Sequence, residues 1–182
     1  MTLDFVRLDH FRGFEAYWMI PKGSRNGKTG KWKKGPGMRF FDEMLSEFGK
    51  LPIIAEDMGL ITPAVDALRN IYGFLGMRVY QFSCDYMFNE EDRVSRVFYT
   101  GTHDNDTIEG WLSETGFDGD RKEERKHIMK RLLDSGAAWV IFPLQDILGL
   151  DSSSRMNVPG TVSGNWAYIF DEGYRAAKVQ EQ

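Results

Sequence analysis

Three short apolar runs in this sequence end in acidic side chains. Each run has the length and the apolar content of a short buried strand, and a polar or glycine residue ends it. In a parallel β/α sheet the carboxyl ends of the strands display the groups that do chemistry. The sequence therefore predicts a sugar-processing or a metal-binding site. The acids and their runs are Asp9 after Phe5–Leu8, Glu56 after Leu51–Ala55 and Asp104 after Val97–Tyr99.

Two of these acids could cleave a glycosidic bond together. Retaining cleavage uses two carboxyl groups about 5–5.5 Å apart, and neighbouring strands lie about 4.8 Å apart. Asp9 lies two residues after Arg7, whose charge favours an ionised nucleophile. Glu56 follows apolar residues, so burial could raise its pKa toward that of a general acid. Asp104, beside His103, could stabilise the charge on the sugar, although a single strand-end acid is more often a helix cap or an ion-pair partner.

A metal-dependent hydrolase is the alternative enzyme, because strand-end histidines and carboxylates can bind Zn²⁺ or Mn²⁺. The chain has three histidines, and none forms a His-x-His pair, which disfavours this alternative. The candidate ligands are Asp9, His10, Glu56, His103, Asp104 and Asp106.

Composition limits the class of protein. The 182 residues are 42% hydrophobic and 14% aromatic, enough for one core, and we expect one domain over residues 1–182. A usual β/α barrel needs about 250 residues. The net charge of −4 favours neither nucleic acid nor an anionic membrane as a partner. A single cysteine, Cys84, and no signal segment or membrane span indicate a cytoplasmic protein.

Hydrophobic periodicity predicts strands alternating with helices, and therefore a parallel sheet. The Gly-, Lys- and Ser-rich stretch 22–37 is interpreted as a solvated surface loop with no regular element. Asn165-Trp166 is expected to open a last short element. The predicted strands are Phe5–Leu8, Pro52–Ala55, Gly76–Phe82, Val97–Tyr99 and Ala137–Leu144, and the predicted helices are Met38–Phe48, Pro63–Ile71 with Thr62 as N-cap, Asp106–Leu112 and Arg121–Leu133.

Three of these motifs, in order, resemble the catalytic signatures of the 4-α-glucanotransferases (amylomaltase, or disproportionating enzyme) of the α-amylase clan. They are Arg7-Leu8-Asp9-His10-Phe11-Arg12-Gly13, Ile54-Ala55-Glu56-Asp57-Met58-Gly59 and Gly101-Thr102-His103-Asp104-Asn105-Asp106-Thr107. Further similarity covers almost the whole chain, at Tyr17-Trp18, Gly30-Lys31-Trp32, Pro143-Leu144-Gln145-Asp146, Arg155-Met156-Asn157-Val158-Pro159-Gly160-Thr161 and Asn165-Trp166.

The resemblance implies retaining transfer of α-1,4-glucan segments between maltooligosaccharides, without a metal or an organic cofactor. It implies that Asp9 is the nucleophile, Glu56 the acid and base, and Asp104 the stabiliser of the transition state. Arg7 would orient Asp9 and His103 would bind sugar hydroxyls. The other substrate-binding residues that it implies are Trp18, Trp32, Asn157 and Trp166.

The resemblance also implies a partial (β/α)8 TIM barrel, roughly strands 4 to 8 with their helices, the C-terminal part of the family's catalytic barrel. After Asn165-Trp166 the family usually continues with an aromatic residue and an arginine, whereas this chain has Ala167-Tyr168-Ile169-Phe170. An open five-stranded sheet would expose two edges, so we expect a homo-oligomer or a complementing chain. A non-catalytic half-barrel that binds glucan or a partner chain through its tryptophans, including Trp111, is the second alternative.

Overall fold

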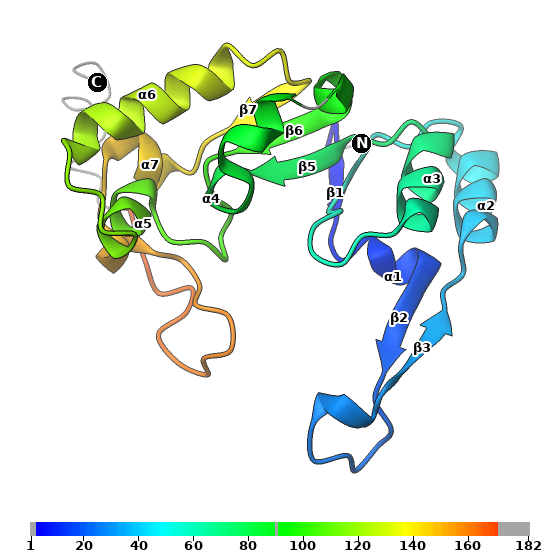
Figure 1. Ribbon diagram of the computed structural model, residues 1–182. Helices are drawn as coiled ribbons and strands as arrows, with labels where there is room; N and C mark the ends of the chain where they lie inside the picture. The colour runs from blue at the N-terminus through cyan, green and yellow to red at the C-terminus, as the bar shows by residue number, and fades with distance from the viewer. Residues whose placement is uncertain (1–2, 90, 171–182) are drawn as a thin grey trace. The chain divides into compact units, whose positions relative to one another are not determined.

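The computed structural model describes residues 3–89 and 91–170, in two compact units, Met1–Met77 and Arg78–Gln182 (Figure 1). Both units combine helices with parallel strands, as the alternation of strands and helices predicted. In the described residues no helix is long and apolar enough to cross a membrane.

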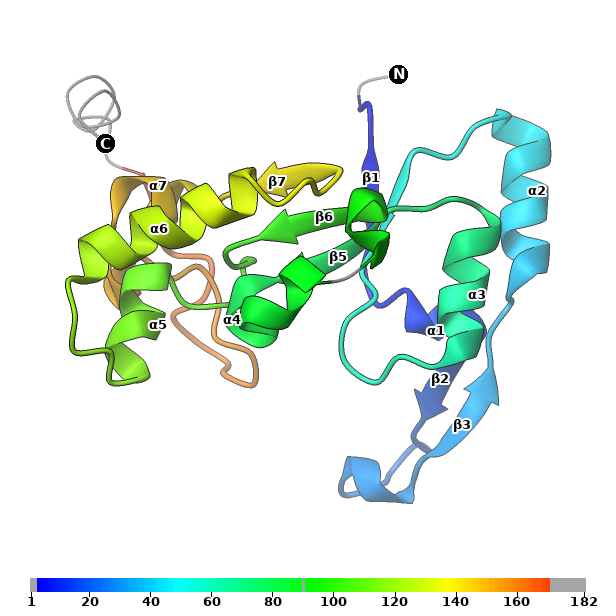
Figure 2. The ribbon, with the colours of Figure 1, turned by 45° about the horizontal axis from the view of Figure 1, so that its top comes forward.

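The first unit is built on two parallel strands, β1 (Val6–Leu8) and β4 (Ile53–Ala55), paired in the register Leu8 to Ala55. A parallel bridge joins β4 to Leu75. The helices are α1 (Arg12–Glu15), α2 (Met38–Phe48) and α3 (Pro63–Ile71), and α2 and α3 lie side by side in both Figures 1 and 2.

Aromatic side chains fill the core of this unit. Phe41, on the apolar side of α2, is fully buried and packs against Phe11, Phe14 and Phe74. Burial of these rings fixes the loop after β1 against the two helices. The core cluster consists of Phe11, Phe41, Ile53, Ala55, Val65, Leu68 and Phe74. Both helices end as their sequences predicted, α2 at Gly49 with a φ of +73° and α3 just before Gly73 with a φ of +63°.

An antiparallel hairpin extends from this unit (Figure 1). It pairs β2 (Ala16–Met19) with β3 (Lys31–Lys34), and a 3₁₀ turn, η1 (Gly27–Thr29), lies between them. The prediction that stretch 22–37 contains no regular element is therefore wrong. Trp18 and Trp32 lie directly opposite each other, and this cross-strand aromatic pair stabilises a strand that exposes all four of its residues.

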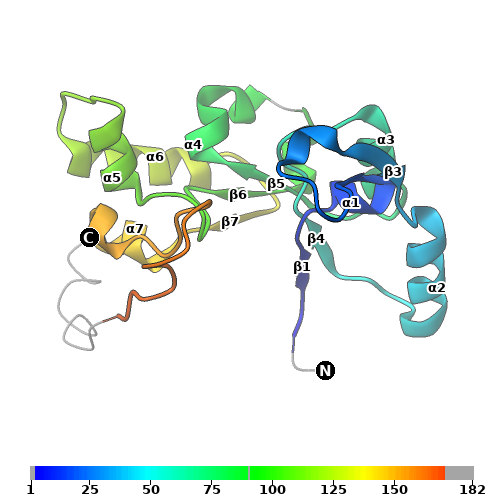
Figure 3. The same cartoon turned by 90° about the horizontal axis from the view of Figure 1, so that it is seen from below.

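The second unit contains the strands β6 (Arg96–Tyr99) and β7 (Trp139–Ile141) and the last two residues of β5 (Gly76–Val79), which form a sheet in the order β5–β6–β7. Strand β6 runs parallel to β7, with Phe98 opposite Val140. Helix α6 (Arg121–Leu133) runs along the sheet and contacts α5 (Ile108–Glu114), as Figures 2 and 3 show. The remaining helical elements are α4 (Tyr80–Ser83), α7 (Leu144–Leu148), η2 (Cys84–Asn89), η3 (Glu91–Ser95) and η4 (Ser152–Ser154).

Several predicted boundaries in the second unit are wrong, although the elements exist. The third strand stops at Val79, because Tyr80–Ser83 turns into a short helix. The fifth predicted strand is shorter than expected, because β7 ends at Ile141 and Leu144 already begins α7. No helix or strand includes Asn165–Phe170; the rest of the predicted last element lies outside the described residues.

Candidate functional site

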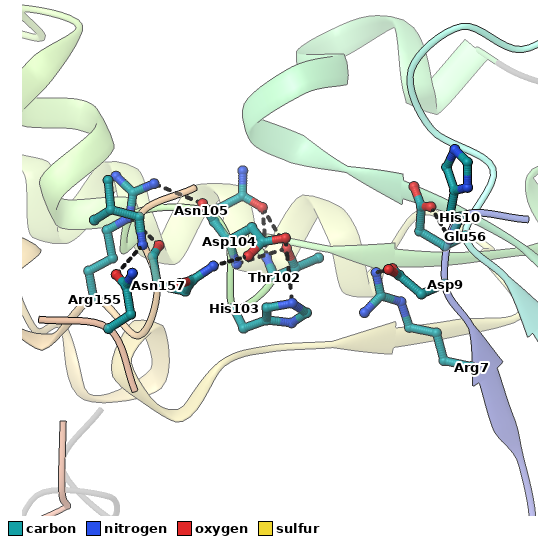
Figure 4. Close-up of polar contacts among 12 residues, drawn as sticks. Arg7, Asp9, His10, Glu56, Thr102, His103, Asp104, Asn105, Arg155 and Asn157 are labelled. Atoms are coloured by element: carbon teal, nitrogen blue, oxygen red, sulfur yellow. Dashed lines mark hydrogen bonds and ion pairs between the residues drawn. The ribbon is translucent and has the colours of Figure 1, made fainter. Parts of the chain in front are cut away.

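Asp9 and Glu56 follow paired strands at the same edge of the first unit. The β1–β4 ladder continues past the strands, because Glu56 N donates to Leu8 O at 2.9 Å and Phe11 N donates to Glu56 O at 3.0 Å. In a parallel pair with this register the two acids are adjacent, and Figure 4 shows both side chains beyond the end of β1. The juxtaposition predicted from the sequence is therefore present.

The carboxylate of Asp9 is exposed to solvent. Its side chain is 78% exposed, and one oxygen accepts a hydrogen bond from Arg7 Nη2 at 3.0 Å (Figure 4). The arginine, only 28% exposed, holds the carboxylate in one orientation. The second oxygen can therefore approach a ligand while the first stays paired.

Glu56 is half-buried and is held by backbone donors. Its carboxylate accepts from His10 N at 2.8 Å and from Met58 N at 3.2 Å. His10 has a φ of +48°, the left-handed conformation, which is uncommon outside glycine. The turn that directs the His10 amide toward Glu56 thus requires a disfavoured backbone conformation, a feature that concentrates at functional sites.

The pKa of Glu56 is raised above its ordinary value. Desolvation by burial is the largest cause, and the negative charge of Asp9 adds to it. The backbone donors of His10 and Met58 and the charge of Arg7 oppose the rise without cancelling it. Two adjacent carboxyl groups with different surroundings can divide the roles of nucleophile and proton donor.

This electrostatic coupling predicts opposite shifts in two variants. Asp9→Asn removes a negative charge, so the pKa of Glu56 should fall. Arg7→Met removes a positive charge, so the pKa of Glu56 should rise. Titration of the ¹³C-labelled glutamate carboxyl by NMR measures both shifts. Glu43→Gln, in an exposed ion pair on α2, serves as the control and should leave Glu56 unchanged; two shifts of the same sign would contradict the coupling.

Asp104 lies in the loop after β6 and is held by a segment far along the chain. Asn157 Nδ2 donates to Asp104 Oδ1 at 2.5 Å, and Arg155 Nη2 donates to its carbonyl oxygen at 2.8 Å. His103 Nε2 lies 3.5 Å from the other carboxylate oxygen (Figure 4). The segment after α7 thus returns to the β6 loop, as Figure 3 also shows. Arg155 was not among the predicted site residues, although it begins the motif that contains Asn157.

Trp166 packs against His103. Their ring centroids are 5.2 Å apart with a 34° angle between the planes, and Trp166 is 63% exposed. Its φ of +58° is a genuine outlier for a bulky side chain. The second unit therefore brings together all four of its predicted site residues, His103, Asp104, Asn157 and Trp166.

A cavity of about 270 Å³ lies beside Asp104 in this unit. Its walls combine aromatic faces with carboxylate, amide and guanidinium groups, a lining suited to a polar ring with apolar faces. They are formed by Gln81, Phe82, Asp104, Asn105, Asp106, Trp111, Glu114, Arg155 and Pro159. Trp111 also meets Tyr80 edge-on and packs against the core.

Trp18 and Trp32 form an aromatic surface on the hairpin of the first unit. Their ring centroids are 5.3 Å apart, and each is more than 40% exposed. The Arg12 guanidinium lies 4.0 Å from the Trp32 ring centroid and donates to Leu60 O at 2.5 Å, in the loop that begins at Glu56. Arg12 therefore joins the tryptophan pair to the Glu56 loop, a role that no local sequence pattern indicated.

No three His, Cys, Asp or Glu side chains converge as metal ligands within the part of the chain that the structure describes.

Carboxylates at the ends of adjacent parallel strands define the class: an α/β protein with its site at the carboxyl edge of the strands. A sequence profile of the 4-alpha-glucanotransferases matches residues 1–172. The chain belongs to this family.

Individual relatives agree with this assignment. A 4-alpha-glucanotransferase of Synechocystis sp. is 45% identical over 92% of this chain, and one of Thermus thermophilus is 42% identical over 90%. An amylomaltase of Streptococcus agalactiae, solved in complex with acarbose, superposes with a TM-score of 0.78 at 30% identity over 93% of this chain. The matched region is 37% of each of the first two proteins and 38% of the third.

Proposed function

We propose that this chain carries the catalytic acids of a retaining 4-α-glucanotransferase, which moves α-1,4-glucan segments between maltooligosaccharides. The observation that supports the proposal best is the contrast between two adjacent carboxyl groups. Asp9 is exposed and paired with Arg7, whereas Glu56 is half-buried with a raised pKa. That contrast is the one a nucleophile and a general acid require.

The chemistry balances with these two residues. The free oxygen of Asp9 attacks the anomeric carbon, the bond to the leaving glucan oxygen breaks, and the proton of Glu56 passes to that oxygen. The departing glucan leaves Asp9 joined to the sugar through an ester. An acceptor hydroxyl then attacks the same carbon, gives its proton to Glu56 and releases Asp9. Net transfer requires that the acceptor, and not water, reaches the ester.

Asp104, with its neighbours, would stabilise the positive charge that develops on the sugar ring. Asn157 and Arg155 hold its carboxylate and carbonyl oxygens, so that the charge is fixed before the substrate arrives. His103, backed by Trp166, would bind sugar hydroxyls. The exposed Trp18 and Trp32 would offer stacking faces to a glucan chain.

In this proposal the chain supplies roughly strands 4 to 8 of a (β/α)8 barrel, and further strands cover its exposed edges. The chain spans 37–39% of the length of the first five relatives that it matches. Val6 in β1 and Ile141 in β7 are 43% and 40% exposed, more than a complete barrel would leave them. A second copy of the chain or a complementing chain would supply the covering strands.

Incubation of the purified chain with maltotriose tests the function. Transfer is expected to give glucose and a ladder of longer maltooligosaccharides, separated by chromatography, and light scattering of the same sample is expected to detect an oligomer. Glucose and maltose without longer products would indicate hydrolysis instead. An active, monodisperse monomer would contradict the proposal that another chain supplies covering strands, but it would leave the proposed transfer activity standing.

A non-catalytic glucan-binding role is the second candidate, and the exposed aromatic surface of Trp18 and Trp32 favours it. It predicts that the folded chain binds maltooligosaccharides, measured by calorimetry, while their length distribution stays constant. The maltotriose assay separates the two functions directly.

A further inference from the structure

The two ends of the Asp104 loop contact one buried carboxylate. The loop joins β6 to α5 and runs from Thr100 to Thr107. At its beginning, Thr100 Oγ1 donates to Asp146 Oδ2 at 2.5 Å; just after its end, Ile108 N donates to Asp146 Oδ1 at 2.8 Å. Asp146, in the first turn of α7, is 1% exposed and Thr100 is fully buried. A single side chain therefore spans both ends of the loop.

Asp146 is itself held in place by a buried arginine. Arg125 Nη1 donates to the Asp146 carbonyl oxygen at 2.7 Å, and Arg125 Nε lies 3.2 Å from Glu109 in α5. Gly149, which follows α7 with a φ of +67°, lets the chain pass close to this arginine. A Cβ at this position would lie 2.3 Å from Arg125 Nη1. Helices α5, α6 and α7 thus fix the position of the carboxylate.

Between its ends, the loop is held by hydrogen bonds within itself and by one from Gln81. Asn105 Oδ1 accepts from the amide and the hydroxyl of Thr102, and Gln81 Nε2 donates to Asp106 O at 2.7 Å. These bonds shape the turn that carries Asp104. The contacts of Asp146 instead set the distance between the end of β6 and the start of α5.

We propose that Asp146 is a positioning residue for Asp104, which fixes the catalytic loop by joining both of its ends. The role rests on the proposed function, since it assigns Asp146 to the same reaction. A buried carboxylate is strongly disfavoured unless donors satisfy both oxygens. If the two ends of the loop moved apart, Thr100 or Ile108 would lose its hydrogen bond to Asp146. The cost of burying the Asp146 carboxylate therefore depends on the geometry of the loop. In this role Asp146 acts through the loop and not on the sugar itself.

The electrostatics agree with this coupling. Burial raises the pKa of the Asp146 carboxyl, and the hydrogen bonds from Thr100 and Ile108 oppose that rise. The charge of Arg125 acts in the same direction as these bonds, and the charge of Asp106 acts against them. The two loop ends are therefore among the groups that make this buried position tolerable for a carboxylate.

The test uses Thr100 rather than Asp146, because removing a buried carboxylate could unfold the unit. Thr100→Val keeps the shape and removes the hydroxyl, and Thr100→Ser keeps the hydroxyl. Ile128→Val, in the core of the same unit, is the control for lost stability. Each variant of the full chain is assayed with maltotriose, and amide exchange of residues 102–107 is followed by mass spectrometry.

Thr100→Val is expected to lower kcat about 10- to 100-fold, with KM changed by no more than about threefold, because misplacement of a catalytic group affects the transition state most. Amide exchange in the loop should accelerate about tenfold or more, as expected when a local closure is weakened. Thr100→Ser should stay close to the wild type in both measurements. Ile128→Val should lower the thermal midpoint without changing loop exchange selectively.

Similar effects of Thr100→Val and Ile128→Val on kcat and on loop exchange would overturn the proposal and leave Asp146 as a structural helix cap. Failure of Thr100→Ser to restore exchange would overturn it as well. If the wild-type chain transfers no glucan, the proposed function fails, and the exchange data alone decide whether Asp146 holds the loop.

Discussion

Asp9→Asn is expected to lower transfer from maltotriose by at least about a thousandfold, because the amide cannot form the ester with the anomeric carbon. The variant keeps the size of the side chain, and its amide oxygen can still accept the hydrogen bond from Arg7 Nη2. Chromatography of the products over time measures the loss. Because Asp9 is 78% exposed, the free energy of unfolding should change little, which separates the chemical effect from misfolding.

A donor with a good leaving group distinguishes Asp9 from Glu56. α-Glucosyl fluoride releases fluoride without needing a general acid, so Glu56→Gln should still release about one equivalent of fluoride per chain and then slow, because no base remains to activate the acceptor. With maltotriose the same variant should lose about 10²- to 10⁴-fold of the rate. Asp9→Asn should fail with both donors. If Glu56→Gln failed with both and Asp9→Asn with neither, the roles of the two acids would be reversed.

The acids could be predicted from the sequence because their positions depend on local patterns. Ile53-Ile54-Ala55 forms a fully buried strand, and the residue after a buried strand lies at the sheet edge whatever the rest of the chain does. Helix α2 could be predicted equally well, because its apolar residues recur at helical spacing and Gly49 marks its end. Asn157 and Trp166 followed only from the resemblance, and the structure brings both to the Asp104 loop.

The hairpin and the buried ionic contacts could not be predicted, because they depend on partners distant in sequence. Lys31–Lys34 has no alternation of apolar and polar residues, and its pairing depends on Trp18 across the hairpin. The bond from Trp18 Nε1 to Gly27 O then fixes the turn. Asp146 lies 38 residues beyond Ile108, to which it bonds, so no window of sequence indicates the contact.

The buried ion pair between Asp57 and Arg69 leads to the largest expected effect on stability. Asp57, the residue after Glu56, lies 2.9 Å from Arg69 Nη1, and both side chains are at most 2% exposed. Its other oxygen accepts from Met77 N at 2.7 Å. Arg69→Met leaves a buried carboxylate without this cation, so we expect the free energy of unfolding to fall by about 3–5 kcal/mol, measured by urea denaturation.

A double variant shows whether the loss comes from removing one charge of this buried pair. Asp57→Asn combined with Arg69→Met removes both charges while an amide oxygen can still accept from Met77 N, so at least half of the lost stability should return. Arg39→Met, in the exposed pair on α2, should change stability by less than about 1 kcal/mol. Equal destabilisation by the single and double variants would contradict the charge argument and would assign the effect to lost packing of the arginine stem. Because Asp57 adjoins Glu56, the double variant should also keep Glu56, the proposed general acid, closer to its native position than Arg69→Met does, and should therefore transfer glucan from maltotriose faster than that single variant.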